Sequence, residues 1–212
     1  AGTHVTITNF RLGGPNSTGG IVNLDAGCDM LVSSTSNAGT FALDLGDNTT
    51  LNLAAGAQIT TAGGLKTTGT LNVTGGTINA IGVTANKFIP GLTSGAINAF
   101  GTLNADIALL DADSTLTATG VLLMGRSASP TGFVNTAGTF IVPAAGDATI
   151  LDSNAADLGN TQMTLPGIIH AANGVTIASG KTLSGSGNVD AAVLNQGTIN
   201  ATGTLTLGNG VS

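Results

Sequence analysis

The segment "GTLNVTGGTINA" (residues 69–80) contains the pattern Gly-Thr-aliphatic-Asn twice, and this repetition is the strongest indication of the fold. Near-copies return as "GAINAFGTLNA" (95–105) and "GTINATGTLTL" (197–207). Side chains of an extended strand alternate between its two faces. Leu71, Val73 and Ile78 are therefore expected to point inward, whereas the Thr and Asn residues between them are expected to point outward.

The short strands recur with a loose period of about 19–22 residues, which is in the range of repeat architectures. The spacing is 20 from Leu51 to Leu71, 19 from Ile97 to Leu116 and 22 from Leu183 to Leu205. Glycines between the strands allow positive φ angles, so the chain can turn a corner there. One such unit cannot bury its own aliphatic face, but stacked units shelter one another. We therefore predict an all-β fold, a single-stranded right-handed parallel β-helix (β-solenoid) of about nine or ten coils.

The composition agrees with this prediction. The chain has no Trp and no Tyr, only 8% charged residues, and as many as 33 Gly, 33 Thr and 19 Asn among its 212 residues. Thr favours strands, and Gly and Asn favour turns. A hydrophobic content of 42% and a mean hydropathy of +0.38 argue against disorder. A two-sheet sandwich is the rival fold, but its hairpins do not explain the longer recurrence.

Residues 1–212 are expected to form one domain, because the amino-acid composition hardly changes along the sequence. The regularity lapses in two stretches, 82–95 and 142–170. Insertions in solenoids project as loops from one face and often carry specific binding. We therefore expect irregular, loop-bearing segments at both places.

Charge and hydropathy exclude two classes of partner. The formal net charge is −6, and the five basic residues are scattered along the chain. Nucleic-acid binding needs clustered cations to displace counterions, so no nucleic-acid partner is expected. No apolar run approaches the roughly 18–20 residues that span a bilayer, so no transmembrane segment is expected either.

Motifs typical of catalysis and cofactor binding are missing from the sequence, including the nucleophile elbow, the zinc-protease helix and the phosphate-binding loops. His4 and His170 have no Ser, Cys or Asp partner nearby in sequence and are expected to be surface or loop histidines. We accordingly predict no catalytic residue, no cofactor and no enzymatic activity.

The candidate ligands for a Ca²⁺ ion are Asp106, Asp111 and Asp113. Asp111 and Asp113 lie two positions apart in "DADS" and share one face if the segment is extended. Carboxylates are suitable ligands for Ca²⁺, and a carboxylate pair also serves acid–base chemistry. Asp equally favours solvated turns, through side-chain hydrogen bonds to the backbone. A Ca²⁺ site, an acid–base pair and a solvated turn all remain possible interpretations.

Thr-x-Thr runs at 6–8, 115–119 and 204–206 raise the separate idea of an ice-binding face. Such a face needs the Thr pair in every coil. Most coils of this chain carry Thr-x-Asn instead, so we expect these threonines to be ordinary outward-facing strand residues.

The segment "GVTIASGKTLSGSGNVDAAVLNQGTINATGTLTLGNG" (174–210) resembles the repeats of secreted bacterial β-helix proteins, namely autotransporter passenger domains and filamentous-haemagglutinin-like adhesins. The resemblance is weaker over 39–120. It implies a β-helix in an extracellular or cell-surface setting, and it carries over no catalytic residues.

The chain stops at "GNGVS" (208–212) without an evident cap, and an open β-helix end invites pairing with another chain. We therefore expect a structural or adhesive segment of a filament, surface layer or adhesin rod. Its expected partners are copies of itself or filament neighbours, and surface glycans are a further candidate. The alternative is a glycan-binding or polysaccharide-degrading β-helix similar to a phage tailspike.

Overall fold

The computed structural model describes residues 3–7, 10–12, 19–33, 43–46, 48–61, 65–85, 95–109, 112–125 and 133–208; for Arg11, Lys66, 80–85 and 105–106 it describes the backbone alone. These residues form an all-β structure without a helix, as the sequence predicted. The strands are β1 (His4–Ile7), β2 (Phe10–Leu12), β3 (Gly20–Leu24), β4 (Asp29–Val32), β5 (Leu43–Leu45), β6 (Thr49–Ala54), β7 (Gln58–Thr61), β8 (Leu65–Thr67), β9 (Thr70–Ala85), β10 (Ala96–Leu109), β11 (Thr115–Met124), β12 (Phe133–Asn135), β13 (Thr139–Val142), β14 (Asp147–Ile150), β15 (Ala156–Asp157), β16 (Asn160–Met163), β17 (Ile168–Ala171), β18 (Val175–Ile177), β19 (Thr182–Asp190), β20 (Val193–Asn195) and β21 (Thr198–Leu207).

Every strand pairing among the described residues is parallel, and the pairings form three ladders. Ladder A contains β1, β4, β7, β14, β17 and parts of β9, β10, β11, β19 and β21. Ladder B contains β2, β5, β8, β12, β15, β18, β20 and parts of β9 and β10. Ladder C contains β3, β6, β13, β16 and the first parts of β9, β10, β11, β19 and β21.

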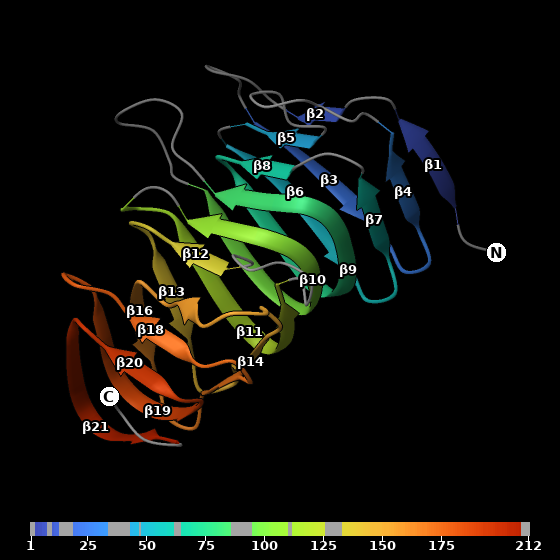
Figure 1. Cartoon of the computed structure of the whole chain (residues 1–212). Coiled ribbons are helices and arrows are strands. Elements are labelled where there is room, and N and C mark those ends of the chain that lie inside the picture. Colours follow the sequence, from blue (N-terminus) through green and yellow to red (C-terminus); the bar gives the residue numbers. More distant parts are fainter. Residues whose placement is uncertain are drawn as a thin grey trace.

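The chain visits the ladders in the fixed order C, A, B, and each complete visit is called a pass below. Figure 1 shows the passes following one another from the N-terminal to the C-terminal end of the molecule. Each strand of an inner pass therefore pairs with the corresponding strands of the preceding and following passes, and the strands at either end pair on one side only. Such pairing satisfies the backbone N–H and C=O groups of the inner passes.

The core lies between the three ladders and consists mainly of aliphatic columns. On ladder C, Leu51, Leu71, Ile97 and Leu116 stand in register and are all 0% exposed. Val73 and Ile78 are buried too, whereas Thr70 and Asn72 are half-buried and Thr74 is exposed. The alternation predicted for 69–78 is thus confirmed. Complete burial of one such aliphatic side chain contributes about 1.5–3 kcal/mol.

Glycines make the corners between ladders C and A. Gly75 has φ +85° and Gly101 has φ +110°, and the parallel register shifts at this corner, between Phe100 and Gly101. A Cβ atom on Gly101 would lie 2.5 Å from the carbonyl oxygen of Gly76 in the neighbouring pass. Only glycine tolerates both the positive φ and this close approach.

The step between paired residues varies more than the sequence predicted. The register confirms the pairs Leu51–Leu71 and Ile97–Leu116. The pair Leu183–Leu205 is wrong, because Leu183 pairs with Ile199, which comes earlier in the chain than Leu205. The longest step among the described pairings runs from Phe10 to Leu43. Steps differ because only the strand residues must stay in register, so corner length is free to change.

The two stretches expected to be irregular have different outcomes. Residues 86–94 of the first lie outside the described residues, and 82–85 continue β9. The second, 142–170, contains β14, β15, β16 and most of β17, which all stay in their ladders. Its irregular sequence is therefore accommodated by corners of unequal length.

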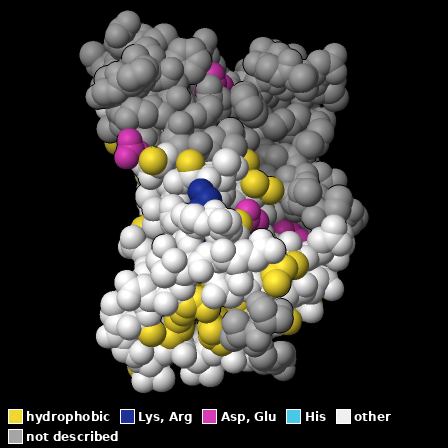
Figure 2. Space-filling view, turned by 60° about the vertical axis from the view of Figure 1, so that its left-hand side comes forward, with side chains coloured by type: hydrophobic (Ala, Val, Ile, Leu, Met, Phe, Trp, Pro, Cys, Tyr) yellow, Lys and Arg dark blue, Asp and Glu magenta, His cyan; other side chains and the backbone are white. Residues whose placement is uncertain are grey.

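Apolar side chains are only partly covered at the last described pass. Ile199, Leu205 and Leu207 are partly exposed, whereas Leu183 and Val189 one pass earlier are 0% exposed. Figure 2 shows hydrophobic side chains gathered over the C-terminal strands, in the lower part of that view. No helix with the length and apolar character of a membrane span occurs in the described part of the chain.

Candidate functional site

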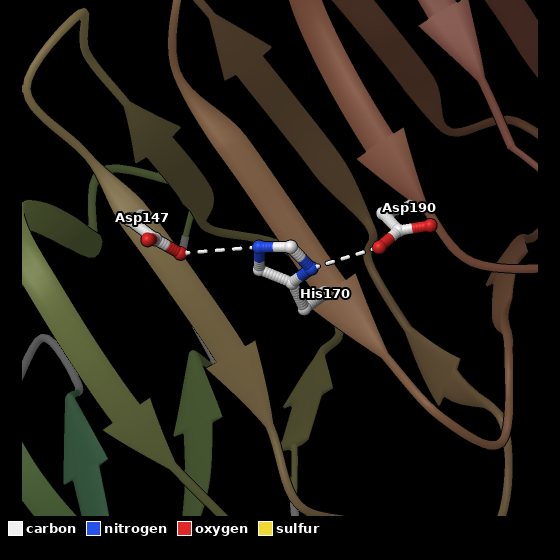
Figure 3. Close-up of polar contacts among 3 residues, drawn as sticks. All are labelled: Asp147, His170 and Asp190. Carbon is white, nitrogen blue, oxygen red and sulfur yellow. Dashed lines mark hydrogen bonds and ion pairs between the residues drawn. The ribbon is translucent and has the colours of Figure 1, made fainter.

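His170 lies between two carboxylates on the outward side of ladder A. It belongs to β17, and the register places it between Thr149 of β14 and Asp190 of β19. Its Nδ1 atom is 3.1 Å from Oδ2 of Asp190, and its Nε2 atom is 3.4 Å from Oδ1 of Asp147. Figure 3 shows the ring between the two carboxyl groups. Asp147, His170 and Asp190, called the His170 cluster, thus connect three consecutive passes.

The ring of His170 is placed between two hydrogen-bond acceptors. A neutral imidazole has one N–H donor and one acceptor nitrogen, whereas a carboxylate only accepts. Both ring nitrogens face carboxylate oxygens, so only the doubly protonated ring donates on both sides. The three side chains are 38%, 38% and 54% exposed, in the order Asp147, His170 and Asp190, so solvent screens these pairs. Their net contribution to stability is accordingly small.

A hollow of about 360 Å³ adjoins the His170 cluster. It lies where β14, β17 and β19 end, and its lining combines polar groups with aliphatic side chains. Its lining residues are Thr149, Ile150, Leu151, Asp152, His170, Ala171, Ala172, Asn173 and Asp190.

Asp152 is held rigidly beside this hollow. It is only 5% exposed, and its Oδ2 atom accepts a hydrogen bond from the backbone N–H of Phe133 at 2.7 Å. The side-chain amide of Asn173 donates to the backbone carbonyl of Asp152, also at 2.7 Å. A Cβ atom on Gly125 would lie 2.3 Å from Oδ1 of Asp152, so the carboxyl group needs a glycine there.

The hollow has the chemistry of a site for a polar, uncharged ligand. Carboxylate, imidazole, amide and hydroxyl groups can exchange hydrogen bonds with hydroxyl groups of a ligand. The exposed carboxylate of Asp190 disfavours anionic ligands such as uronates and phosphates by like-charge repulsion. Both nitrogens of His170 already face carboxylates, so the ring has no nitrogen directed at a substrate as a general base would.

A second distinctive surface lies on the outward side of ladder C, and we call its outward residues face C. Four asparagines stand in one column, and each of the last three donates its side-chain amide to the preceding one. Asn52 donates to Asn23 at 2.7 Å, Asn72 to Asn52 at 2.7 Å and Asn98 to Asn72 at 3.0 Å. The amide ladder continues the parallel register onto the side chains.

Face C carries no charged side chain over its nine described strand segments. Its two outward columns are Ile21, Thr50, Thr70, Ala96, Thr115, Thr139, Asn160, Thr182 and Thr198, and Asn23, Asn52, Asn72, Asn98, Thr117, Ile141, Gln162, Ser184 and Asn200. By contrast, ladder A includes His4, Asp29, Asp147, His170 and Asp190. Ladder B includes Arg11, Asp44, Lys66 and Asp157.

The structure leaves the predicted Ca²⁺ site untested. Asp111 lies outside the described residues, and the side chain of Asp106 in β10 is not described. Asp113 is exposed in the turn before β11 and has an interaction partner. Among the side chains that the structure describes, no group of three or more His, Cys, Asp or Glu is placed to hold a metal ion.

Sequence reasoning missed the His170 cluster, because Asp147, His170 and Asp190 lie far apart in the sequence, one on each of three passes. It described His170 as a surface histidine, which agrees with its exposure, but assigned it no carboxylate partner. The usable signal was the register, which puts Thr149, His170 and Asp190 in one column. That register needs the true corner lengths, and the period is poorly kept in this part of the sequence.

The comparisons with known proteins found nothing to set beside this chain: no family model, no curated protein and no solved structure matches it.

Proposed function

We propose that the passes form a right-handed parallel β-helix, and that the protein is a non-enzymatic structural or adhesive rod outside the cell. In this proposal it is a segment or subunit of a filament, surface layer or adhesin. Its task is mechanical: the stacked passes give length and stiffness, and the outward faces make contacts.

The observation that carries the proposal is the continuity of the three ladders. All three run through successive passes in parallel register, and their inward positions are mainly filled by buried hydrophobic residues. Nine segments at a spacing of about 4.8 Å make a rod about 40 Å long. A continuous hydrophobic core of this kind resists local unfolding and suits a load-bearing element.

Two further observations support the proposal. The resemblance of 174–210 to repeats of autotransporter passenger domains and filamentous-haemagglutinin-like adhesins suggests the extracellular setting. At the last described pass, the partly exposed Ile199, Leu205 and Leu207 offer an apolar surface to a further parallel rung. Such a rung can come from the same polypeptide or from another one.

Electron microscopy of the purified chain, combined with protease challenge, tests the proposal. We expect filaments or lateral arrays whose strands resist proteases under conditions that digest ordinary loops. Discrete particles that cleave a polysaccharide, with turnover abolished by Asp147→Asn or Asp190→Asn, would overturn it.

The second candidate function is glycan binding, and the hollow beside the His170 cluster favours it. Its volume of about 360 Å³ and its hydrogen-bonding groups suit one unit of a neutral sugar. A titration of the chain with neutral oligosaccharides, followed by nuclear magnetic resonance, tests this function. Shifts confined to Thr149, Asn173 and their neighbours would support glycan binding, and unchanged spectra would remove it.

A further inference from the structure

We propose that two copies of this chain pack against each other laterally through face C. The inference rests on the proposed structural role, since it names the lateral surface by which such a rod assembles. Three features of face C support this inference. Its described strand segments have no charged side chains, its side chains both donate and accept hydrogen bonds, and hydrogen bonds already hold some of these side chains in place.

The distribution of charge singles out face C among the three outward surfaces. The chain has a formal net charge of −6, so two copies repel each other at long range. Ladders A and B include charged residues such as Asp29, Asp44 and Asp147. A contact through those ladders would bring carboxylates together or bury them, at a cost of several kcal/mol. Face C allows close approach without either cost.

The side chains of face C are complementary to themselves. Hydroxyl and amide groups both donate and accept hydrogen bonds, so a second copy of the same surface offers the matching partners. A two-fold interface requires this property, because the same patch contributes both sides. Apolar side chains at Ile21, Ala96 and Ile141 in the same columns add burial without charge; Ile21 is 70% exposed.

Face C is also ordered before any partner arrives. The hydrogen bonds along Asn23, Asn52, Asn72 and Asn98 fix these amides at the repeat of the strands. Packing therefore costs less side-chain entropy than it would on a surface of long, free side chains. Paired β-sheet faces with stacked Asn and other small side chains form dry, interdigitated contacts in the same way.

The size of face C predicts a weak, reversible contact. Nine segments at about 4.8 Å and strands about 15 Å long give an area of about 600 Å² on each partner. Stable specific interfaces bury about 800 Å² on each partner. Two chains alone should therefore exchange between monomer and dimer, whereas the same contact repeated along a longer rod would hold firmly.

Sedimentation velocity over a concentration series tests the proposal with matched double variants. Thr50→Lys with Thr70→Lys adds two cations on adjacent passes of face C. Thr77→Lys with Thr102→Lys adds the same two cations on adjacent passes of ladder A. All four threonines are half-buried strand residues, and both variants change the net charge equally.

We expect the wild-type chain and the ladder A variant to dimerise alike, whereas the face C variant needs at least about tenfold higher concentration, because it would bury unpaired lysines. The pair Thr182→Lys and Thr198→Lys, at the other end of face C, should repeat this result. Circular dichroism checks that each variant is folded.

Equal dimerisation of the face C and ladder A variants would overturn the proposed interface. A wild-type chain that stays monomeric up to its solubility limit would also overturn it. Neither result decides the mechanical role, because end-to-end filaments in the electron microscope would still support a structural rod. A face C variant that loses lateral arrays but keeps single filaments separates the two proposals directly.

Discussion

The passes between Thr49 and Phe100 and those between Phe133 and Asp190 use the same ladders but are stabilised differently. In the first group the inward columns are mainly aliphatic, and the outward Asn column repeats from pass to pass. In the second group the core contains an aromatic pair, Phe133 and Phe140, with ring centroids 5.2 Å apart and planes at 61°.

The buried polar side chains of the two groups also differ in kind. Those described in the first group are all threonines, whereas Asn135 and Asp152 bring an amide and a carboxyl group into the second. Each of these two side chains ties backbone groups of neighbouring segments together. Thr161 takes an inward position of ladder C between Phe140 and Leu183. The parallel backbone ladder thus tolerates very different interiors, provided that such buried groups find hydrogen-bond partners.

The largest effect is expected from removing a side chain of the aliphatic column. Leu71 is 0% exposed and lies in register between Leu51 and Ile97. Leu71→Ala should lower the free energy of unfolding by about 3 kcal/mol, since it leaves a cavity that the flanking passes cannot fill. Urea denaturation followed by circular dichroism measures this loss. The outward neighbour Thr70→Ala is the control, and a similar loss in both variants would contradict the inward column.

The next effect concerns the polar interior of the second group. Asn135 donates its side-chain amide to the carbonyl oxygens of Leu158 and Asn160, both at 3.0 Å. Asn135→Ala leaves these two carbonyls without their amide donor and should cost about 2 kcal/mol, measured by the same urea denaturation. Asn98→Ala removes one half-buried side-chain hydrogen bond, from the amide of Asn98 to Asn72, and should lower the free energy of unfolding by clearly less. Equal losses would mean that the buried amide has no special role.

A smaller effect is expected in the Asn column of face C. Asn72 donates to Asn52 and accepts from Asn98, so Asn72→Ala removes two side-chain hydrogen bonds of a half-buried residue. We expect a loss of about 1 kcal/mol in the free energy of unfolding. Asn104→Ala is the matched control, because Asn104 is exposed and donates only to Asn79, at 3.2 Å. A loss at Asn104 as large as that at Asn72 would argue against the column as a stabilising unit.

The difference between the two groups of passes also explains which structural features could be predicted from the sequence alone. Parallel pairing and the inward places of Leu71 and Ile78 were predictable, because like residues recur at nearly constant spacing in the first group. The buried positions of Asn135 and Asp152 could not be predicted, because their hydrogen-bond partners are backbone groups of other passes. No local sequence pattern indicates such partners. The Asn column could be found only once the register was known. The step between its members in β9 and β10, Asn72 and Asn98, is longer than the period that the sequence predicted.

The smallest effect is expected at the His170 cluster, the outward cross-link of the second group. His170→Gln removes contacts to two exposed carboxylates and should cost about 0.5 kcal/mol in dilute buffer. High salt screens such pairs, so the difference from the wild type should nearly vanish near about 1 M NaCl. The matched control is His4→Gln, since His4 is more exposed and has one carboxylate, Asp29, at 3.9 Å. Thermal melts at low and high salt measure both variants. A His170 effect that persists in high salt would mean that packing against the hollow, rather than charge, gives this side chain its place in the fold.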